Sequence, residues 1–173
     1  MFTSHYQFSK INHSSPKEIG HYKIIEHIYK FRGKTNKRYI AIVEEYNYFV
    51  FIVKFCLQER KIHPDRFNRL TKLNECSRVL TTIGNIIKDV YTNNPYASFG
   101  FIGSNLPEEK KENTKRFKLY SKVVSQVISP VAFEHRQTIK HSAYLLINRD
   151  NHEPDLLNKI DTMFEEIYIL NQD

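Results

Sequence analysis

The run from Tyr48 to Leu57 constrains the fold more than any other part of the chain. Apolar side chains dominate both of its alternating faces: one carries Phe49, Phe51, Val53, Phe55 and Leu57, and the other carries Tyr48, Val50, Ile52, Lys54 and Cys56. A strand that is apolar on both faces has other layers above and below it, so it lies inside a sheet and not at its edge. The sequence therefore predicts a central strand here.

The patterns on either side predict strands before this run and alternating helices and strands after it. Further strands are expected over residues 22–31, 39–45, 97–102, 133–138 and 142–148, and a short one around Phe67, Leu70 and Leu73. Helices are expected from Asn74 to Asn93, from Asn113 or Thr114 to Ile128, and from Pro154 onward. This order predicts an α/β or α+β fold with a mixed, mostly antiparallel central sheet flanked by three helices.

Length and composition fit a single domain. The chain has 173 residues, of which 40% are hydrophobic and 26% charged, so it can bury a core. No repeat or linker divides it, and we expect a loose N-terminal arm over 1–18 and one domain over 19–173. No apolar run reaches the roughly 18 residues that span a bilayer, and no secretory signal is readable. We therefore expect a cytoplasmic protein with no membrane partner.

The net charge of +7 is unevenly distributed along the chain. Residues 1–86 hold 15 Lys and Arg against 7 Asp and Glu, whereas residues 87–173 hold 11 against 12. Such a basic half is either a solvated surface or a field that attracts nucleic acid, anionic cofactors or an acidic protein. For nucleic acid, Phe31 and Tyr39 would supply stacking rings between phosphate-binding cations. The predicted nucleic-acid-binding residues are Lys30, Arg32, Lys34, Lys37 and Arg38.

Several kinds of catalytic site are missing from the sequence. It contains no phosphate-binding lysine loop, dinucleotide glycine pattern, serine elbow or zinc-protease helix. Cys76, at the start of a predicted helix, is either a small buried residue or a thiol with a lowered pKa, and Cys56 lies within a strand. His135 and His141 fit no metal-ligand spacing, so no metal is expected. A metal-free ribonuclease would use His135, Arg136, Lys140 and His141.

A candidate anion site lies where the strand over 97–102 is followed by a helix. Hydroxyls, cations and free helix N–H groups would converge there at the positive end of the helix dipole. The predicted anion-binding residues are Ser104, Thr114, Lys115 and Arg116. Ordinary helix capping with a solvated cation pair explains the same residues.

The run from Asn113 to Lys122, followed by Phe133-Glu134, resembles the C-terminal half of a GNAT-type N-acetyltransferase. That family has a helix written roughly N-x-x-A-x-x-L-Y-x-K, and Asn113, Leu119, Tyr120 and Lys122 match it. Arg116 replaces the usual alanine. The resemblance covers about residues 70–148. A similar Gly-Ser…Thr-x-Arg-x-x-Leu-Tyr pattern also occurs in small uncharacterised bacterial proteins.

The resemblance implies an acetyl-CoA cleft between two parallel strands that splay apart. It implies that Tyr120 protonates the departing thiolate and that Asn113 contacts the cofactor; Tyr120 is otherwise a core aromatic. The window Lys72–Ser77 stands at the family's pyrophosphate loop but has no glycine, and Glu75 would set a like charge beside the pyrophosphate. The remaining candidate cofactor-binding residues are Lys72, Ser77 and Arg78.

Three functions follow as alternatives. The first is a GNAT-like protein with a lost or altered acyl-CoA site and a binding or regulatory role. The second is an active N-acyltransferase, for which Glu44, Glu45 or His135 would be the base. The third is a nucleic-acid-binding protein that uses the basic half. Whether the chain is an enzyme stays open, and acetyl-CoA is the one cofactor that the resemblance implies.

Overall fold

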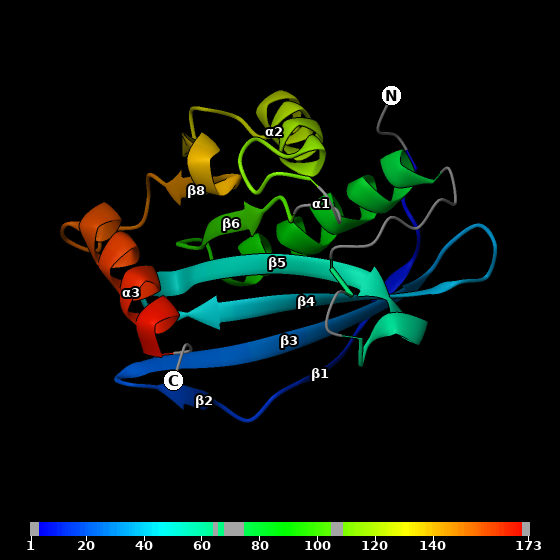
Figure 1. The fold of residues 1–173 in the computed structure, drawn as a ribbon, viewed down its shortest axis with the longest axis horizontal. Coiled ribbons are helices and arrows are strands. Elements are labelled where there is room, and N and C mark those ends of the chain that lie inside the picture. Colours follow the sequence, from blue (N-terminus) through cyan, green and yellow to red (C-terminus); the bar gives the residue numbers. More distant parts are fainter. Residues whose placement is uncertain (1–3, 64–65, 68–74, 105–108, 171–173) are drawn as a thin grey trace.

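A mixed sheet of eight strands forms the centre of the protein in a computed structural model that describes residues 4–63, 66–67, 75–104 and 109–170 (Figure 1). The strands lie in the order β1-β3-β4-β5-β6-β8-β7, and β2 pairs with β3 beside this path. Their bounds are β1 Phe8–His13, β2 Lys17–Ile19, β3 Tyr22–Arg32, β4 Arg38–Tyr46, β5 Val50–Leu57, β6 Ser98–Ile102, β7 Phe133–Thr138 and β8 Ala143–Asn148. Of the strand pairs in the described ranges, only β5 and β6 run parallel.

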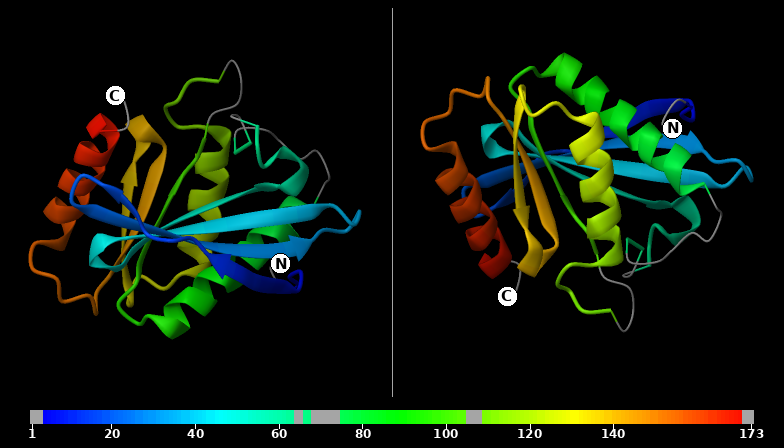
Figure 2. Two further views of the ribbon diagram at one scale, coloured as in Figure 1. Left: turned by 90° about the horizontal axis from the view of Figure 1, so that it is seen from below. Right: turned by 90° about the horizontal axis from the view of Figure 1, so that it is seen from above.

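Three α-helices cover the two faces of this sheet. Helices α1 (Cys76–Asn93) and α2 (Lys115–Val127) lie over one face, and α3 (Leu156–Leu170) packs on the other (Figure 2). A parallel neighbour of β5 requires a crossover connection, and α1 forms it between β5 and β6. The fold class predicted from the sequence is thereby confirmed.

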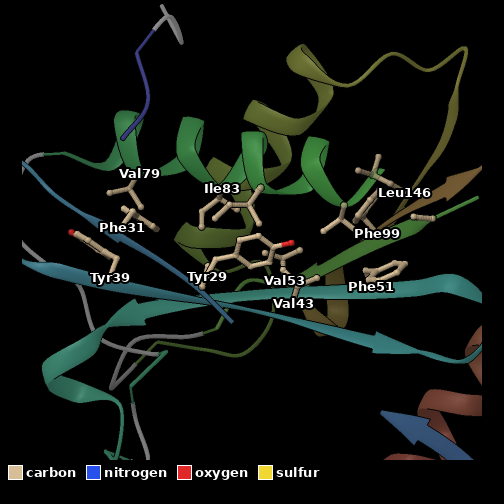
Figure 3. Packing of buried hydrophobic residues seen from close by; sticks show 14 of the residues in the cluster. Tyr29, Phe31, Tyr39, Val43, Phe51, Val53, Val79, Ile83, Phe99 and Leu146 are labelled. Atoms are coloured by element: carbon tan, nitrogen blue, oxygen red, sulfur yellow. The ribbon is translucent and has the colours of Figure 1, made fainter. Parts of the chain in front are cut away.

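The larger core lies between α1 and the sheet. Val79 and Ile83 of α1 point toward Tyr29, Phe31 and other rings of the strands below (Figure 3). The four inward residues Val79, Ile83, Ile86 and Val90 repeat at helical spacing, which explains why this segment is a helix with one buried stripe. The smaller core joins α3 to Tyr22, Ile24 and Val50.

One expectation about local structure needs correction, and a second lies largely outside the described residues. Residues 8–13, placed in a loose arm, form strand β1 on the edge of the sheet, and the ring of Tyr6 is buried. The short strand expected around Phe67, Leu70 and Leu73 falls outside the described residues except for Phe67, which lies in a turn. Among helices within the described ranges, none is both long enough and apolar enough to cross a bilayer.

Candidate functional site

Strands β5 and β6 diverge after a short stretch of pairing. They pair only at Val50 with Ser98, Phe51 with Phe99, and Ile52 with Gly100. Beyond this point β5 continues beside β4 as far as Leu57, while β6 continues beside β8. A Cβ on Gly100 would lie 2.7 Å from Cδ1 of Ile52, so glycine permits the close approach at the last paired position. The two parallel strands therefore form a wedge.

A cavity of about 410 Å³ lies where this wedge opens beneath α1 and α2. Its volume falls within the range of about 300–1,000 Å³ that is usual for small-molecule sites. Most of its lining is apolar: Val53, Phe55, Phe99 and Phe101 from the strands, Leu80, Gly84, Ile87 and Tyr91 from α1, and Tyr120, Val123, Val124 and Ile128 from α2 or its end. The polar lining residues include Lys54, Thr81, Asn85, Lys88, Ser104 and Arg116.

Tyr120 stands at this wedge between the two parting strands. Its ring centroid lies 6.0 Å from that of Phe55 on β5 and 5.6 Å from that of Phe101 on β6. Burial raises the pKa of Tyr120 to about 12, and Arg116 only partly opposes this shift. Within the described part of the chain its hydroxyl makes no hydrogen bond. Tyr120 is thus a neutral phenol at pH 7, next to the cavity, that can donate a proton or a hydrogen bond.

The predicted anion site lies at the start of α2. Several of the N–H and hydroxyl groups there already bond to other groups of the protein. Of the two predicted caps, Asn113 and Thr114, it is Thr114 that caps the helix: its hydroxyl accepts from the Phe117 N–H at 3.1 Å and donates to the Gly103 carbonyl at 2.5 Å. The Lys115 N–H donates to the Glu109 carboxylate at 2.8 Å. An external anion would have to displace that carboxylate.

The other residues predicted near this helix start are dispersed. Arg116 donates to the carbonyl of Phe67. Both Arg116 and Ser104 line the cavity. Lys115 is exposed. Asn113, the predicted cofactor contact, is exposed with a left-handed φ of 51°, and its N–H donates to the Ile139 carbonyl at 3.1 Å.

The start of α1 differs from the predicted pyrophosphate loop. Ser77 is exposed in the first turn, and Lys72 lies outside the described residues. Arg78 is turned to the N-terminal segment, with its guanidinium 4.2 Å from the centre of the Tyr6 ring. Neither alternative for Cys76 holds: its side chain is exposed, and desolvation raises the pKa of the thiol, which Arg116 only partly offsets.

The expectation for Glu75 is also wrong, because its carboxylate points into the protein. It accepts hydrogen bonds from the Tyr6 hydroxyl at 2.6 Å, the Tyr39 hydroxyl at 2.7 Å and the Lys34 N–H at 2.7 Å. Burial favours the neutral acid, but these three donors outweigh it and lower the pKa of Glu75. A Cβ on Gly33 would lie 2.6 Å from a Glu75 carboxylate oxygen, so only glycine leaves room there. Glu75 joins the N-terminal segment, the β3–β4 turn and α1.

In the predicted nucleic-acid surface most of the cations are exposed, but the two aromatic rings are buried. Phe31 and Tyr39 are buried at 3% and 0% exposure and stack on each other with centroids 4.9 Å apart, so neither is available to a base. The cations occupy the ends of β3 and β4 and their turn: Arg32, Lys34, Lys37 and Arg38 are exposed, and Lys30 is half-buried. Lys37 pairs with Glu59 at 2.8 Å.

None of the three candidate bases lines the cavity, although Lys54, the partner of Glu44, does. The Glu44 carboxylate is 2.7 Å from Lys54 Nζ, and Glu45 is 2.6 Å from His27 Nε2. His135 Nδ1 lies 2.7 Å from the Tyr144 hydroxyl. Of the other predicted ribonuclease residues, Arg136 pairs with Glu134 at 2.6 Å, and Lys140 and His141 are exposed. Within the described residues, no three His, Cys, Asp or Glu side chains gather as a metal site requires.

Comparison of the chain with known protein families, curated proteins and solved structures finds no match.

Proposed function

We propose that the protein is a GNAT-like binding protein with an altered acyl-CoA site. The observation that carries this proposal is the wedge between the parallel strands β5 and β6, whose pairing stops at Ile52 and Gly100 and gives way to an apolar cavity. The sequence resemblance implies that acyl-CoA lies between two such strands. Tyr120, which matches the family's tyrosine, borders the same cavity.

The wedge offers backbone groups as well as apolar walls. From Val53 onward β5 pairs with β4 along one edge, and the described residues supply no strand partner along the other. Backbone N–H and C=O groups on an unpaired edge can bind an extended chain of amides, as in peptide recognition by strand addition. The pantetheine arm of CoA is a chain of this kind.

The phosphate end is the altered part of the site. The window 72–77 contains no glycine, and glycines let backbone N–H groups approach a pyrophosphate closely. Arg78, in the first turn of α1, stacks on Tyr6 instead. We therefore expect the pantetheine and acyl parts of the ligand to supply most of the affinity and the nucleotide to add little.

Calorimetric titration of the full chain with hexanoyl-CoA, hexanoyl-pantetheine and adenosine 3′,5′-bisphosphate tests this proposal. We expect the first two to bind with dissociation constants within about tenfold of each other, a difference of about 1.4 kcal/mol, and the nucleotide not to bind detectably. Hexanoyl-CoA binding more than about a hundredfold tighter than hexanoyl-pantetheine would show an intact phosphate site. Absence of binding by both acyl compounds would refute the proposed function.

A second candidate, an active acyltransferase, is favoured by the neutral Tyr120 hydroxyl at the wedge. In such a reaction an amine nitrogen attacks the thioester carbonyl, the C–N bond forms, the C–S bond breaks, and the leaving thiolate takes the phenol proton while a base takes the proton of the amine. General-acid catalysis contributes about 10²–10⁴-fold, so Tyr120→Phe should lower kcat by at least about a hundredfold. Tyr96→Phe, which removes a hydroxyl from an exposed ring outside the cavity lining, should leave kcat within about twofold. Wild-type protein without turnover on a panel of amines would eliminate this candidate.

A further inference from the structure

Helix α1 carries a second stripe of residues beside its buried one. Leu80, Gly84, Ile87 and Tyr91 recur at spacings of four, three and four, all are half-buried, and all line the cavity. Tyr120, Val123 and Val124 of α2 line the opposite side. Two apolar helix surfaces that face each other normally interdigitate. Here a cavity lies between them.

Gly84 stands within this stripe. A Cβ built on it would meet no heavy atom within 4 Å, so neither crowding nor a special backbone angle requires a glycine. Glycine also disfavours a helix interior relative to alanine. Gly84 therefore costs helix stability without a local packing reason. Because it lies on the cavity wall, its effect is to leave part of the cavity empty.

The lining of the cavity changes along α2. Ser104 and Arg116 line it near the first turn of α2. Ile128, just past the end of α2, lines it together with Tyr91 and Phe133, whose rings lie 5.5 Å apart, and Lys88 adds one cation a turn before Tyr91. A ligand with a polar head and an apolar tail would place its head near Arg116 and its tail near Tyr91.

From this arrangement we infer that the cavity holds the aliphatic tail of a medium-length fatty acyl group and that Gly84 makes room for it. The assignment of the head group to CoA rests on the proposed function, whereas the tail site rests on the cavity itself. A methylene group occupies roughly the 30 Å³ of a liquid water molecule, so 410 Å³ holds a tail on the order of ten carbons. An α-helix is about 10–12 Å across with its side chains, which is too bulky for a cavity of this volume.

The experiment measures binding of saturated acyl-CoAs with 2 to 14 carbons, and of the matching free fatty acids, to the full chain by calorimetry. Burial of each methylene group should tighten Kd about fourfold, equivalent to about 0.8 kcal/mol, until the tail fills the cavity near ten carbons. Gly84→Leu adds four carbon atoms to the cavity and should shorten the longest well-bound tail by about four carbons. Gly84→Ala should shorten it by about one.

Ser125→Leu is the matched control, because it adds the same side chain at an exposed position of α2, and it should leave the chain-length profile unchanged.

If thermal unfolding shows that Gly84→Leu does not fold, Val124→Phe fills the same cavity from α2 and should give the same shortening. Equal affinity for acetyl-CoA and decanoyl-CoA, or an unchanged profile in the folded filling variant, would overturn the inference and leave the acyl-CoA proposal standing. Chain-length-dependent binding of free fatty acids, with no gain from CoA or pantetheine, would support the tail site and refute the proposed function.

Discussion

The two faces of the sheet are filled to different extents. On one face, Leu156, Ile160, Met163 and Ile167 of α3 are all at most 8% exposed. On the other, the inner stripe of α1 is equally buried, but its second stripe and the facing side of α2 border a cavity. Well-packed interiors have few voids larger than a water molecule. The comparison indicates that α3 and the inner stripe of α1 hold the sheet together, whereas the space between α1 and α2 is the site that we propose for a ligand.

The largest expected effect separates these two regions directly. Met163 of α3 is fully buried, so Met163→Ala should lower the free energy of unfolding by about 3 kcal/mol. Val124 is half-buried beside the cavity, so Val124→Ala should cost less than about 1 kcal/mol, because part of its surface already faces empty space. Urea unfolding measures both values. Similar losses in the two variants would mean that the face of α1 and α2 is packed like the face of α3.

A second prediction concerns the buried carboxylate that joins α1 to the β3–β4 turn. Glu75→Gln keeps the shape of the side chain but weakens three charge-assisted hydrogen bonds, and it should lower the free energy of unfolding by about 2 kcal/mol. Because the folded pKa of Glu75 is lowered, its contribution is complete above the unfolded pKa of about 4.3 and is lost as the pH falls through the folded value.

Unfolding midpoints between pH 2 and pH 7 measure this contribution. The wild type should lose stability on acidification more steeply than Glu75→Gln, whereas the exposed control Glu18→Gln should follow the wild type. An unchanged pH profile in Glu75→Gln would show that the pKa of Glu75 is the same in the folded and the unfolded protein, which would contradict the lowered folded pKa.

A third prediction contrasts two glycines and expects effects of opposite sign. Gly33→Ala places a methyl group against the Glu75 carboxylate and the Tyr39 ring and should destabilise the fold by about 1–3 kcal/mol. Gly84→Ala places it in open space within a helix and should stabilise the fold by about 0.5–1 kcal/mol. Chemical unfolding of the two variants gives both signs, and destabilisation by Gly84→Ala would mean that α1 closes on α2 in solution.

The central sheet could be predicted from the sequence because its signals are local. Both faces of the run around Phe51 are apolar, and this run is β5, inside the sheet. Thr114 caps α2 as its position before an apolar stripe predicts. The period-two alternation of β3 also carried a signal that the nucleic-acid hypothesis overlooked, since Phe31 alternates with Lys30 and Arg32 and so points to the opposite face, into the core.

The role of Glu75 could not be predicted, because it depends on residues far away in the chain. Its hydrogen-bond partners Tyr6, Lys34 and Tyr39 are 69, 41 and 36 positions distant. Nothing local distinguishes this glutamate from a solvated helix-start residue. The cavity is similar: a glycine within a helical pattern signals a special environment, but only the arrangement of α1, α2 and the splayed strands places Gly84 on a cavity wall.

The smallest expected effect concerns the basic β3–β4 end, whose cations contrast with the apolar cavity. Arg32 and Arg38 are exposed and lie directly opposite each other in the register. A bound polyanion would relieve the repulsion between them.

Each phosphate contact contributes about −0.7 to the slope of log K against log salt for single strands. Arg38→Gln should therefore weaken binding of a short single-stranded RNA at low salt severalfold and reduce that slope by about 0.7. Lys37→Gln, whose cation already pairs with Glu59, should have less effect on both. Because the rings of Phe31 and Tyr39 are buried, RNAs of different base composition should bind alike. Fluorescence anisotropy across a salt series measures all three, and no binding at about 50 mM salt, where the electrostatic attraction is strong, would eliminate a nucleic-acid role for this surface.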